Sequence, residues 1–270
     1  MKVILLTRRS AFQIYCANRL WKKGLLQLVI FENGNSYAGN RAFSGISDFF
    51  KKLTKGFALL LSNPINIVNY ADKYLNHKKY YGHQEFHNQR LLKNNYMDTE
   101  NGMPIVNVSD INSDEVNKII QEYKPDLVFV FGTRLIKPHI FKNRPIPFVN
   151  MHWGWSPDYR AEGIVTALAY GGPDALGVTV HLLNAGIDSG DILYQLRPVL
   201  DVNDNFYSIG LKLALLGIKL FAKCAESLGE NGYLSGTPQD LSVSAFYGSK
   251  YMRKHAELYR MAWKNLQNAV

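Results

Sequence analysis

The sequence predicts an α/β fold built on a Rossmann-like, mostly parallel sheet with helices on both faces. The chain opens with an apolar strand over 3–6, a helical pattern that Ser10 is expected to cap and a second apolar strand over 25–31. This order is typical of parallel strands joined by crossover helices. The continuous apolar run over 126–131 indicates a strand buried on both faces. A long amphipathic pattern over 206–228 predicts a helix that covers the sheet.

The composition suits one large domain, or one domain with a small addition. The chain has 270 residues, and hydrophobic residues make up 47% of it, which is enough for a full core. Cys16 and Cys224 fall in helical patterns far apart in the sequence, which favours buried thiols. The apolar run at the N-terminus is short for a signal peptide, and no run reaches the roughly 20 apolar residues of a membrane span. We therefore expect a cytoplasmic protein.

Positive charge is concentrated in the first part of the chain. Residues 1–100 contain 15 Lys and Arg against 6 Asp and Glu, whereas residues 101–270 contain 16 of each, so the net charge of +9 belongs to the first 100 residues. This distribution favours an anionic partner, namely a phosphorylated substrate, a nucleic acid or a membrane surface. Solvated lysines without such a partner are the alternative.

Residues 40–100 are predicted to form an insert that is partly helical. Apolar residues recur at three- and four-residue gaps over 43–61 with lysines between them, which indicates an amphipathic basic helix. This helix either packs on the core or lies at a membrane surface or a dimer interface. The stretch 70–96 is rich in Tyr, Asn, His and Lys and is expected to face the substrate. Its histidines lack an accompanying Cys or carboxylate pattern, so we expect no metal site.

The second half of the chain continues the alternation of strands and helices. A helix is expected from Ser113, which precedes two acidic residues, to Pro125. Further strands are expected over 146–149, 177–183 and 192–199.

A domain boundary is predicted near residue 200. Residues 1–200, with the insert over 40–100, form the main domain. Residues 201–270 are expected to form a C-terminal extension made of the long helix, the stretch 239–250 and a last helix over 252–266.

Three polar residues stand at predicted strand ends and turns. Asn150 and His152 follow the apolar run over 146–149, and residues two apart on a strand point to the same side. Asp188 lies in a Gly-flanked turn after a later strand. Because ligands of open α/β sheets bind at strand ends, the three side chains are expected to converge there. An amide, an imidazole and a carboxylate suit the transfer of an acyl group to a nucleophile.

Each of these residues alone also has a structural interpretation. Asp188 precedes Ser-Gly, which suits a tight turn. His181 alternates with Val180 on a strand, as a hydrogen-bonded core histidine does. Only the ordered set of motifs favours a site over these alternatives.

The motifs follow one another as Asn-x-His over 150–152, Pro157, Tyr-Arg over 159–160, Gly-x-Thr-x-His over 177–181 and Asp-x-Gly over 188–190. In order and spacing this set resembles the signature of the folate-dependent formyltransferases, which include glycinamide ribonucleotide, methionyl-tRNA and sugar N-formyltransferases. The resemblance covers about residues 126–199. It implies transfer of a formyl group from N10-formyltetrahydrofolate to a primary amine. Asn150 and His152 are then the oxyanion donors, and Asp188 orients His152 or a water and helps to remove the amine proton.

The resemblance also implies binding residues and marks two departures from the family. The stretch 132–138 resembles the one that holds the pterin end of the folate. Residues 239–250 resemble the short hairpin and loop that follow the catalytic domain in methionyl-tRNA and sugar formyltransferases. Residues 153–156 read Trp-Gly-Trp-Ser where many members have Pro-Ser-Leu-Leu, and Ala161 follows Arg160 where a Gly is usual. Both departures leave the acceptor open. The implied cofactor-binding residues are Arg134, Leu135, Ile136, His181 and Leu183, and the expected substrate contacts are Arg8, Arg9, Trp153, Tyr159 and Arg160.

Some of the expected substrate contacts have alternatives of their own. Arg8 and Arg9 precede a helix N-terminus, which is a natural anion site, and are either phosphate contacts or surface arginines. Trp153 either stacks on a sugar or nucleobase or fills the core. The loop that contains the two arginines lacks the glycines of a dinucleotide fingerprint, so an NAD site is not expected.

The favoured acceptor is the amine of a nucleotide-linked amino sugar, since the basic first part of the chain suits a phosphorylated partner. The chain has no room for the separate C-terminal domain of tRNA-acting members, so we expect no nucleic-acid partner. One alternative is a glycinamide ribonucleotide formyltransferase. Another is a non-catalytic protein that binds sugar nucleotides or a membrane surface on the same scaffold. A homodimer is also expected.

Overall fold

A computed structural model describes residues 1–33, 80, 92, 97–161, 163–242 and 255–268. The predictions for the basic helix over 43–61 and for most of the stretch 70–96 concern residues outside this part of the chain. The sheet, the helices that cover it and the candidate site all belong to the described part.

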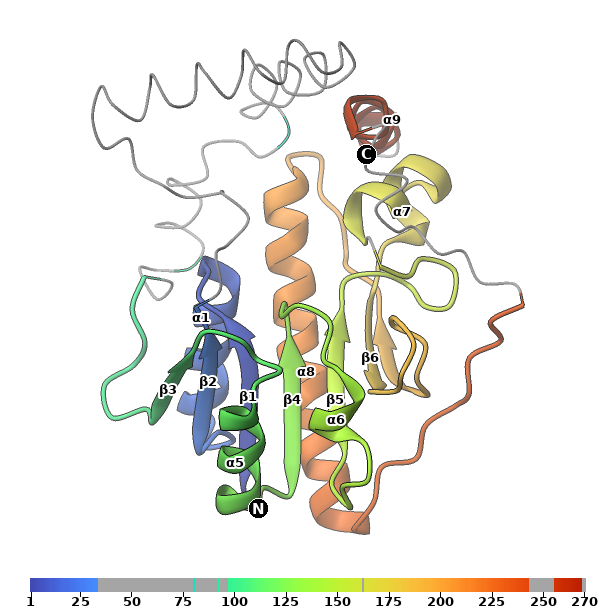
Figure 1. The fold of residues 1–270 in the computed structure, drawn as a ribbon. Coiled ribbons are helices and arrows are strands. Elements are labelled where there is room, and N and C mark those ends of the chain that lie inside the picture. The colour runs from blue at the N-terminus through green and yellow to red at the C-terminus, as the bar shows by residue number, and fades with distance from the viewer. Residues whose placement is uncertain (34–79, 81–91, 93–96, 162, 243–254, 269–270) are drawn as a thin grey trace, which may run out of the picture.

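Seven strands of the described chain form one sheet in the order β3-β2-β1-β4-β5-β6-β7 (Figure 1). β1 to β5 pair in parallel, whereas β6 is antiparallel to both β5 and β7. The predicted mostly parallel α/β sheet is therefore confirmed. The strands are β1 (Val3–Arg8), β2 (Leu28–Glu32), β3 (Ile105–Val108), β4 (Leu127–Phe131), β5 (Phe148–His152), β6 (Val178–Leu182) and β7 (Ile192–Leu196).

Helices cover both faces of the sheet, as predicted. Val3 and Leu5 of β1 belong to a core shared with α1 and α8, while Ile4 and Leu6 belong to a second core shared with α5 and α6. This division follows from the period of two along a strand. Each fully buried aliphatic side chain stabilises the fold by about 1.5–3 kcal/mol relative to an exposed one. The helices are α1 (Ala11–Lys22), α5 (Asp114–Tyr123), α6 (Pro138–Phe141), α7 (Ile164–Gly171), α8 (Phe206–Asn231) and α9 (His255–Asn268), with a short 3-10 helix at Pro173–Ala175.

Two local expectations differ from the structure. β7 ends at Leu196 rather than at Val199, because its partner β6 begins at Val178, opposite Leu196, and offers no residue beyond it. Ser10 is the N-cap of α1 by position, but its hydroxyl donates to the side chain of Gln13 and makes no capping bond to the helix backbone.

The long helix α8 packs on the sheet along the face that α1 also covers (Figure 1). Phe221 of α8 stacks on Phe129 of β4 with ring centroids 4.1 Å apart. The side chain of Asn205 accepts two backbone amides at the start of the helix, and Gly232, with a φ of 77°, ends it. The helix therefore shares its core with the strands, and the division of the chain near residue 200 stays a prediction.

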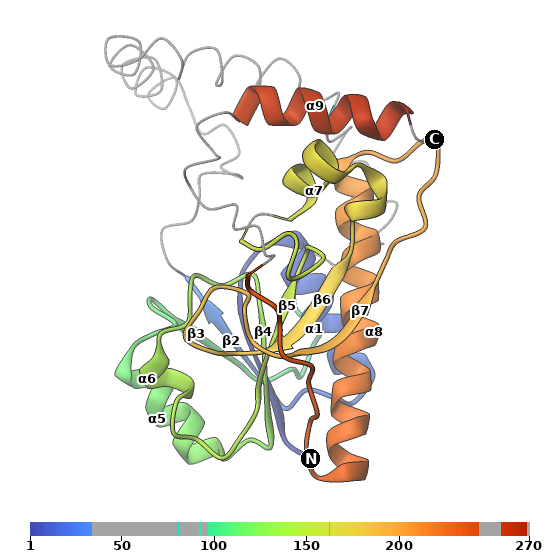
Figure 2. The same ribbon diagram turned by 90° about the vertical axis from the view of Figure 1, so that its right-hand side faces the viewer.

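The C-terminal extension ends in the expected helix, which is α9, and this helix lies against α7 (Figure 2). The side-chain amide of Asn265 donates to the carbonyl oxygens of Leu168 and Ala169 at the end of α7. Tyr80 packs into a ring cluster with Phe206, Tyr259 and Trp263. Most of the hairpin expected over 239–250 lies outside the described residues.

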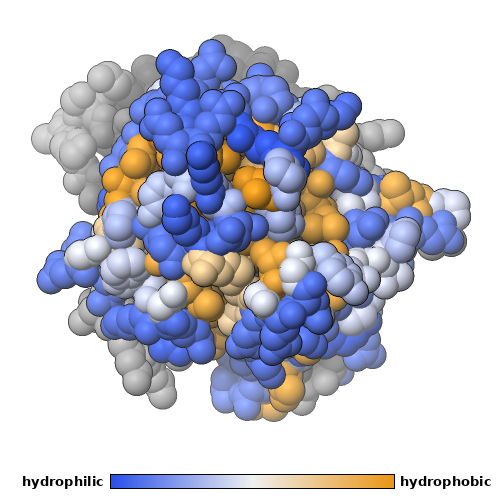
Figure 3. Space-filling view, turned by 90° about the horizontal axis from the view of Figure 1, so that it is seen from below, coloured by the Kyte–Doolittle hydropathy of each residue, from blue (hydrophilic) through white to orange (hydrophobic). Residues whose placement is uncertain are grey.

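Within the described ranges, no helix combines the length and the apolar character that crossing a membrane requires. The face opposite the carboxyl edge of the sheet carries apolar side chains interrupted by many polar ones (Figure 3).

Candidate active site

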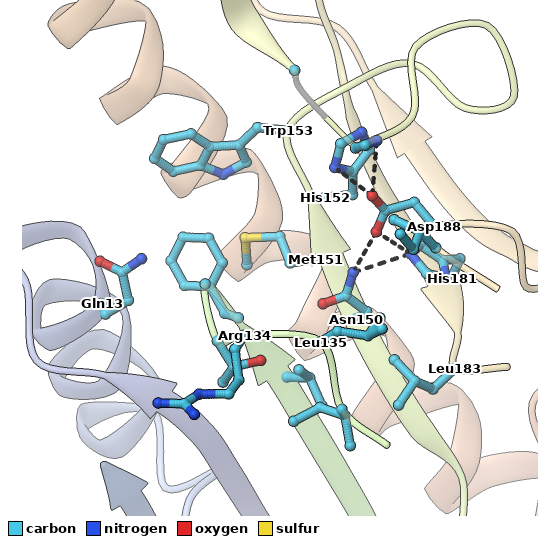
Figure 4. A pocket seen from close by; sticks show the side chains of 18 of the residues that line it. Gln13, Arg134, Leu135, Asn150, Met151, His152, Trp153, His181, Leu183 and Asp188 are labelled. Atoms are coloured by element: carbon cyan, nitrogen blue, oxygen red, sulfur yellow. Dashed lines mark hydrogen bonds and ion pairs between the residues drawn. The ribbon is translucent and has the colours of Figure 1, made fainter. Parts of the chain in front are cut away.

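A pocket opens at the carboxyl edge of the sheet, over the ends of β4 and β5 and beside the start of α1 (Figure 4). Its cavity volume is about 470 Å³, which lies within the range of small-molecule sites. β1 and β4 are neighbours in the sheet although they are not consecutive in the chain. Ligands of open α/β sheets bind at such switch points.

A buried polar cluster forms one side of this pocket. Asn150 lies opposite His181 in the antiparallel pairing of β5 with β6, and its Nδ2 atom is 3.1 Å from His181 Nε2 and 3.1 Å from Asp188 Oδ1. His152 Nδ1 is 3.4 Å from Asp188 Oδ2. The structure thus brings Asn150, His152, His181 and Asp188 together, while their catalytic and binding roles stay predictions.

Backbone carbonyls fix the tautomer of each imidazole. His181 Nδ1 is 2.8 Å from Leu182 O and His152 Nε2 is 2.8 Å from Tyr159 O, so each of these nitrogens carries a hydrogen and donates it. His181 Nε2 lies 3.1 Å from Asn150 Nδ2 and 3.4 Å from Asp188 Oδ1, so it accepts from the Asn150 amide when His181 is neutral and donates to Asp188 when His181 is protonated. Both nitrogens of His152 face protein groups, and the Asn150 oxygen points away from Asp188 towards the pocket (Figure 4).

Asp188 is a buried carboxylate with several donors around it. Burial raises its pKa, but the charge of His152, the hydrogen bond and charge of His181 and the backbone amide of Ala161 together lower it more. The net pKa therefore lies well below the usual aspartate value. Asp188 is ionised at neutral pH and acts as a fixed negative charge beside the two imidazoles. Within the described residues, no three His, Cys, Asp or Glu side chains form a metal-binding group.

Apolar side chains line the pocket next to this cluster (Figure 4). Leu135 and Ile187 line it with their side chains partly in solvent, and Ile136 and Leu183 line it while packing in or against the core. Arg134 also lines the pocket, but its guanidinium turns away from the polar cluster (Figure 4). The residues for which folate contacts were predicted therefore include an apolar wall next to the carboxamide and imidazole groups.

A buried glutamate that the sequence did not single out holds the arginines at the strand ends. Glu32 accepts from Arg8 Nε at 3.0 Å with one oxygen, and its other oxygen lies 2.5 Å from Arg134 Nε and accepts the Ile111 amide at 3.1 Å. The side chain of Glu32 is fully buried. Arg9 stacks over Phe31 at 4.9 Å. Neither Arg8 nor Arg9 lines the pocket, so their role as substrate contacts stays a prediction.

The loop after β5 places its aromatic residues differently. Trp153 lines the pocket, edge-on to Phe12 at 5.2 Å, whereas Trp155 packs under the guanidinium of Arg197 at 3.8 Å, away from the pocket lining. Tyr159 meets the cluster through its backbone oxygen. The Arg160 guanidinium donates to Ile187 O at 3.3 Å. Tyr159 and Arg160 lie outside the pocket lining, so their substrate contacts also stay predictions.

Sequence reasoning missed Gln13 as well. Its side chain lies across Gly132, where a Cβ atom would come within 2.2 Å of Gln13 Nε2, and it lines the pocket. Gly132 has a φ of 66°, a backbone conformation that favours glycine. The position of Gly132 directly after the buried strand β4 is the local sequence feature that indicates a close contact at this point.

Together, the doubly covered sheet and the polar cluster at its carboxyl edge define an α/β protein with a site suited to group transfer. The chain belongs to the formyl transferase family, because the family model matches residues 46–223.

Known proteins resemble the chain in sequence and in fold. A methionyl-tRNA formyltransferase from Kosmotoga olearia is 29% identical over 148 residues, which are 54% of this chain and 47% of that protein. The chain spans about half the length of the curated relatives that it matches.

The fold is also that of solved structures. A sugar N-formyltransferase from Shewanella matches with a TM-score of 0.56 at 13% identity, over 97% of this chain and 87% of that one. An N-formyltransferase from Helicobacter canadensis, solved with folinic acid and dTDP-3-aminofucose, matches with a TM-score of 0.53 at 15% identity, over 97% of this chain and 81% of that one. At these identities the likeness shows the fold.

Proposed function

We propose that the protein transfers the formyl group of N10-formyltetrahydrofolate to the primary amine of a nucleotide-linked amino sugar. The observation that carries this proposal is the meeting of Asn150, His152 and Asp188 at the end of a pocket with an apolar wall. Membership of the formyl transferase family supports the reaction class.

The described residues fit the folate. The flat face of a pterin suits the apolar wall that Leu135, Ile136 and Leu183 form. The polar cluster lines the same pocket, so a folate bound against this wall can present its formyl group to the cluster. When bound, the folate supplies the formyl group. The backbone over 132–136 and the side chain of His181 would then hold it, as the resemblance implies.

The chain's own groups orient the reactants and move the proton. Asp188 is charged at neutral pH, and its low pKa makes it a weak base, so it acts by orienting His152 or a water rather than by keeping a proton itself. Removal of the proton from the attacking amine therefore runs through His152 or a water that Asp188 orients. Two groups on β5 and one in the turn before β7 also supply orientation, which is a large term when two substrates react.

Stabilising the oxyanion requires two donors to turn towards the pocket. The Asn150 amide now donates to Asp188 and His181, and the Nε2–H of His152 donates to Tyr159 O. We expect substrate binding to flip the Asn150 amide and to shift the loop that contains Tyr159. A single donor of this kind contributes roughly 100- to 1,000-fold in rate.

The amino-sugar acceptor rests on charge. The excess positive charge lies in the first 100 residues, which suits a nucleoside diphosphate. A second acceptor, the amine of methionyl-tRNA, is favoured by the names of the sequence relatives, although the chain spans about half of their length. Glycinamide ribonucleotide is a third amine of the same chemical class.

A panel of acceptors tests the proposal. The protein is incubated with N10-formyltetrahydrofolate and nucleotide-linked amino sugars, methionyl-tRNA or glycinamide ribonucleotide, and mass spectrometry detects the formylated product. We expect formylation of at least one amino sugar and none with Asn150→Ala. Formylation of methionyl-tRNA or glycinamide ribonucleotide alone would replace the acceptor, and no product from any amine would reject the reaction.

The cytoplasmic location and the homodimer belong to the same proposal. Cell fractionation tests the first, and light scattering of the purified protein tests the second. Recovery of the chain with membranes, or a monomeric mass at micromolar concentration, would contradict them.

A further inference from the structure

The turn that contains Asp188 is held from the C-terminal extension. Gln239 lies in the segment after α8, and its Nε2 atom donates to Asp188 O at 3.0 Å and to Gly190 O at 2.6 Å. Thr237 pairs with Ile192 through both of its backbone groups, at 2.9 and 2.8 Å. One side chain therefore bridges two carbonyl oxygens of a turn about 50 residues earlier in the chain.

This turn has reason to need an external support. Asp188 has a φ of 47°, a left-handed conformation that is uncommon for residues with a side chain, although Asp tolerates it better than most. Its carboxylate must reach His152 on one side and Asn150 on the other, with separations of 3.4 and 3.1 Å. A small rotation of the turn would lengthen both contacts together.

Gln239 is an unusual choice if stability alone is considered. Its Oε1 atom is buried and has no hydrogen-bond partner among the described residues. An unpaired buried acceptor typically costs about 1–3 kcal/mol. Residues that break a local rule of this kind are concentrated at functional sites.

We propose that Gln239 is a positioning residue that fixes the carboxylate of Asp188 against His152 and Asn150 by holding the carbonyl oxygens of Asp188 and Gly190. The inference rests on the proposed function, since it acts through the group that orients the catalytic imidazole. It also makes the C-terminal extension part of the active site.

Two variants remove the donor. Gln239→Met keeps the length of the side chain without a donor, and Gln239→Glu places a carboxylate oxygen against two carbonyl oxygens. We expect kcat to fall at least roughly tenfold in Gln239→Met and further in Gln239→Glu, because small misplacements of catalytic groups are costly. The KM values of both substrates should change by less than roughly threefold, since Gln239 does not line the pocket.

Asn265 supplies the matched control. Its side-chain amide also donates to two backbone carbonyl oxygens, those of Leu168 and Ala169, but in the contact between α9 and α7. Asn265→Leu should lower the midpoint of thermal unfolding about as much as Gln239→Met, with kcat unchanged. Equal losses of kcat in both variants would mean that Gln239 has only a structural role, and would overturn the inference.

A double-mutant cycle with Asp188→Asn separates the inference from the proposed function. Adding Gln239→Met to Asp188→Asn should cost nothing further in kcat, because the positioned group is already lost. A full additional loss, or an unchanged kcat in both single Gln239 variants, overturns the inference and leaves the function standing. An unchanged kcat in Asp188→Asn would instead reject the assigned chemistry.

If no acceptor reacts, the positioning role of Gln239 can still be tested by a measurement that does not depend on enzymatic activity. The ring protons of His152 are titrated by nuclear magnetic resonance in the intact chain. If Gln239 positions Asp188, the midpoint for His152 moves in Gln239→Met and stays in Asn265→Leu. No difference between the wild type and Gln239→Met in this titration would reject the positioning role directly.

Discussion

The backbone amide of Ala161 lies 3.1 Å from Oδ2 of Asp188, and both residues have positive φ angles, 73° for Ala161 and 47° for Asp188. A glycine is usual at the position of Ala161 in the family that the sequence resembles. The hydrogen bond explains why the backbone keeps this conformation although the residue has a side chain. The backbone N–H of Ala161 therefore connects the loop after β5 to Asp188, and a substitution of the Ala161 side chain keeps this donor.

Ala161→Gly should therefore stabilise the protein without changing its activity. Relief of the left-handed strain is worth about 1–2 kcal/mol, and the greater freedom of glycine in the unfolded chain offsets about 0.4–1 kcal/mol. Urea unfolding should show a gain of between zero and about 1.6 kcal/mol. Ala161→Val should lower both the unfolding free energy and kcat, because a β-branched residue resists this conformation. A stabilised Val variant would contradict the argument.

The sequence predicted the parts of the site that depend on local pattern. Asn150 and His152 stand two residues apart at the end of an apolar run, and Asp188 lies in a glycine-flanked turn, so their approach to one pocket followed from strand geometry. The parallel strands and the covering helices followed from period and order.

Contacts between segments that are distant in the chain could not be predicted from local sequence patterns. The Arg8 guanidinium, for which a phosphate contact was expected, bonds to Glu32 on the next strand, because the pairing register sets the two side by side. Gln239 reaches Asp188 through a folded-back segment that no periodicity marks. Trp155 turns to Arg197 although Trp153, two residues earlier, lines the pocket, since both follow the end of β5 and the alternation of a strand does not apply to them.

His152→Ala should keep the fold and lose most of the turnover. The side chain makes one hydrogen bond to Tyr159 O and one ion pair to Asp188, and it is not part of either apolar core. We expect kcat to fall roughly 100- to 1,000-fold, with circular dichroism unchanged. His139→Ala removes a histidine that bonds to a backbone oxygen, that of Asn112, and does not line the pocket, and it serves as the control. A fully active His152→Ala enzyme would contradict the assigned role.

The stability of the protein in acid should depend on Asp188. Its pKa in the folded state is lowered below the value of about 3.9 in the unfolded chain. Such a group stabilises the fold at pH above about 4, and this contribution is lost as the pH falls from about 4 towards the lower pKa of the folded state. Urea titrations should show wild type more stable than Asp188→Asn at pH 7, with the difference shrinking below about pH 4. A difference that grows in acid would mean that the pKa is raised instead.

Glu32 should support both the fold and the binding of the folate. Glu32→Leu leaves the Ile111 amide without an acceptor and releases Arg8 and Arg134, although both guanidinium groups still reach water. We therefore expect the free energy of unfolding in urea to fall by about 1–3 kcal/mol. This is less than the cost of breaking a fully buried ion pair, because both arginines are partly exposed. Because Arg134 belongs to the loop over 132–136, KM for N10-formyltetrahydrofolate should rise several-fold.

Glu32→Gln should lose less of both quantities, because its amide oxygen still accepts from Ile111. The half-exposed pair of Lys22 and Glu100, with atoms 2.9 Å apart, provides the matched control for loss of an ion pair. Glu100→Gln should cost less than about 1 kcal/mol and leave KM unchanged. If Glu32→Leu and Glu100→Gln behaved alike, the buried glutamate would hold neither the arginines nor the loop, and Arg134 would be positioned by its own backbone alone.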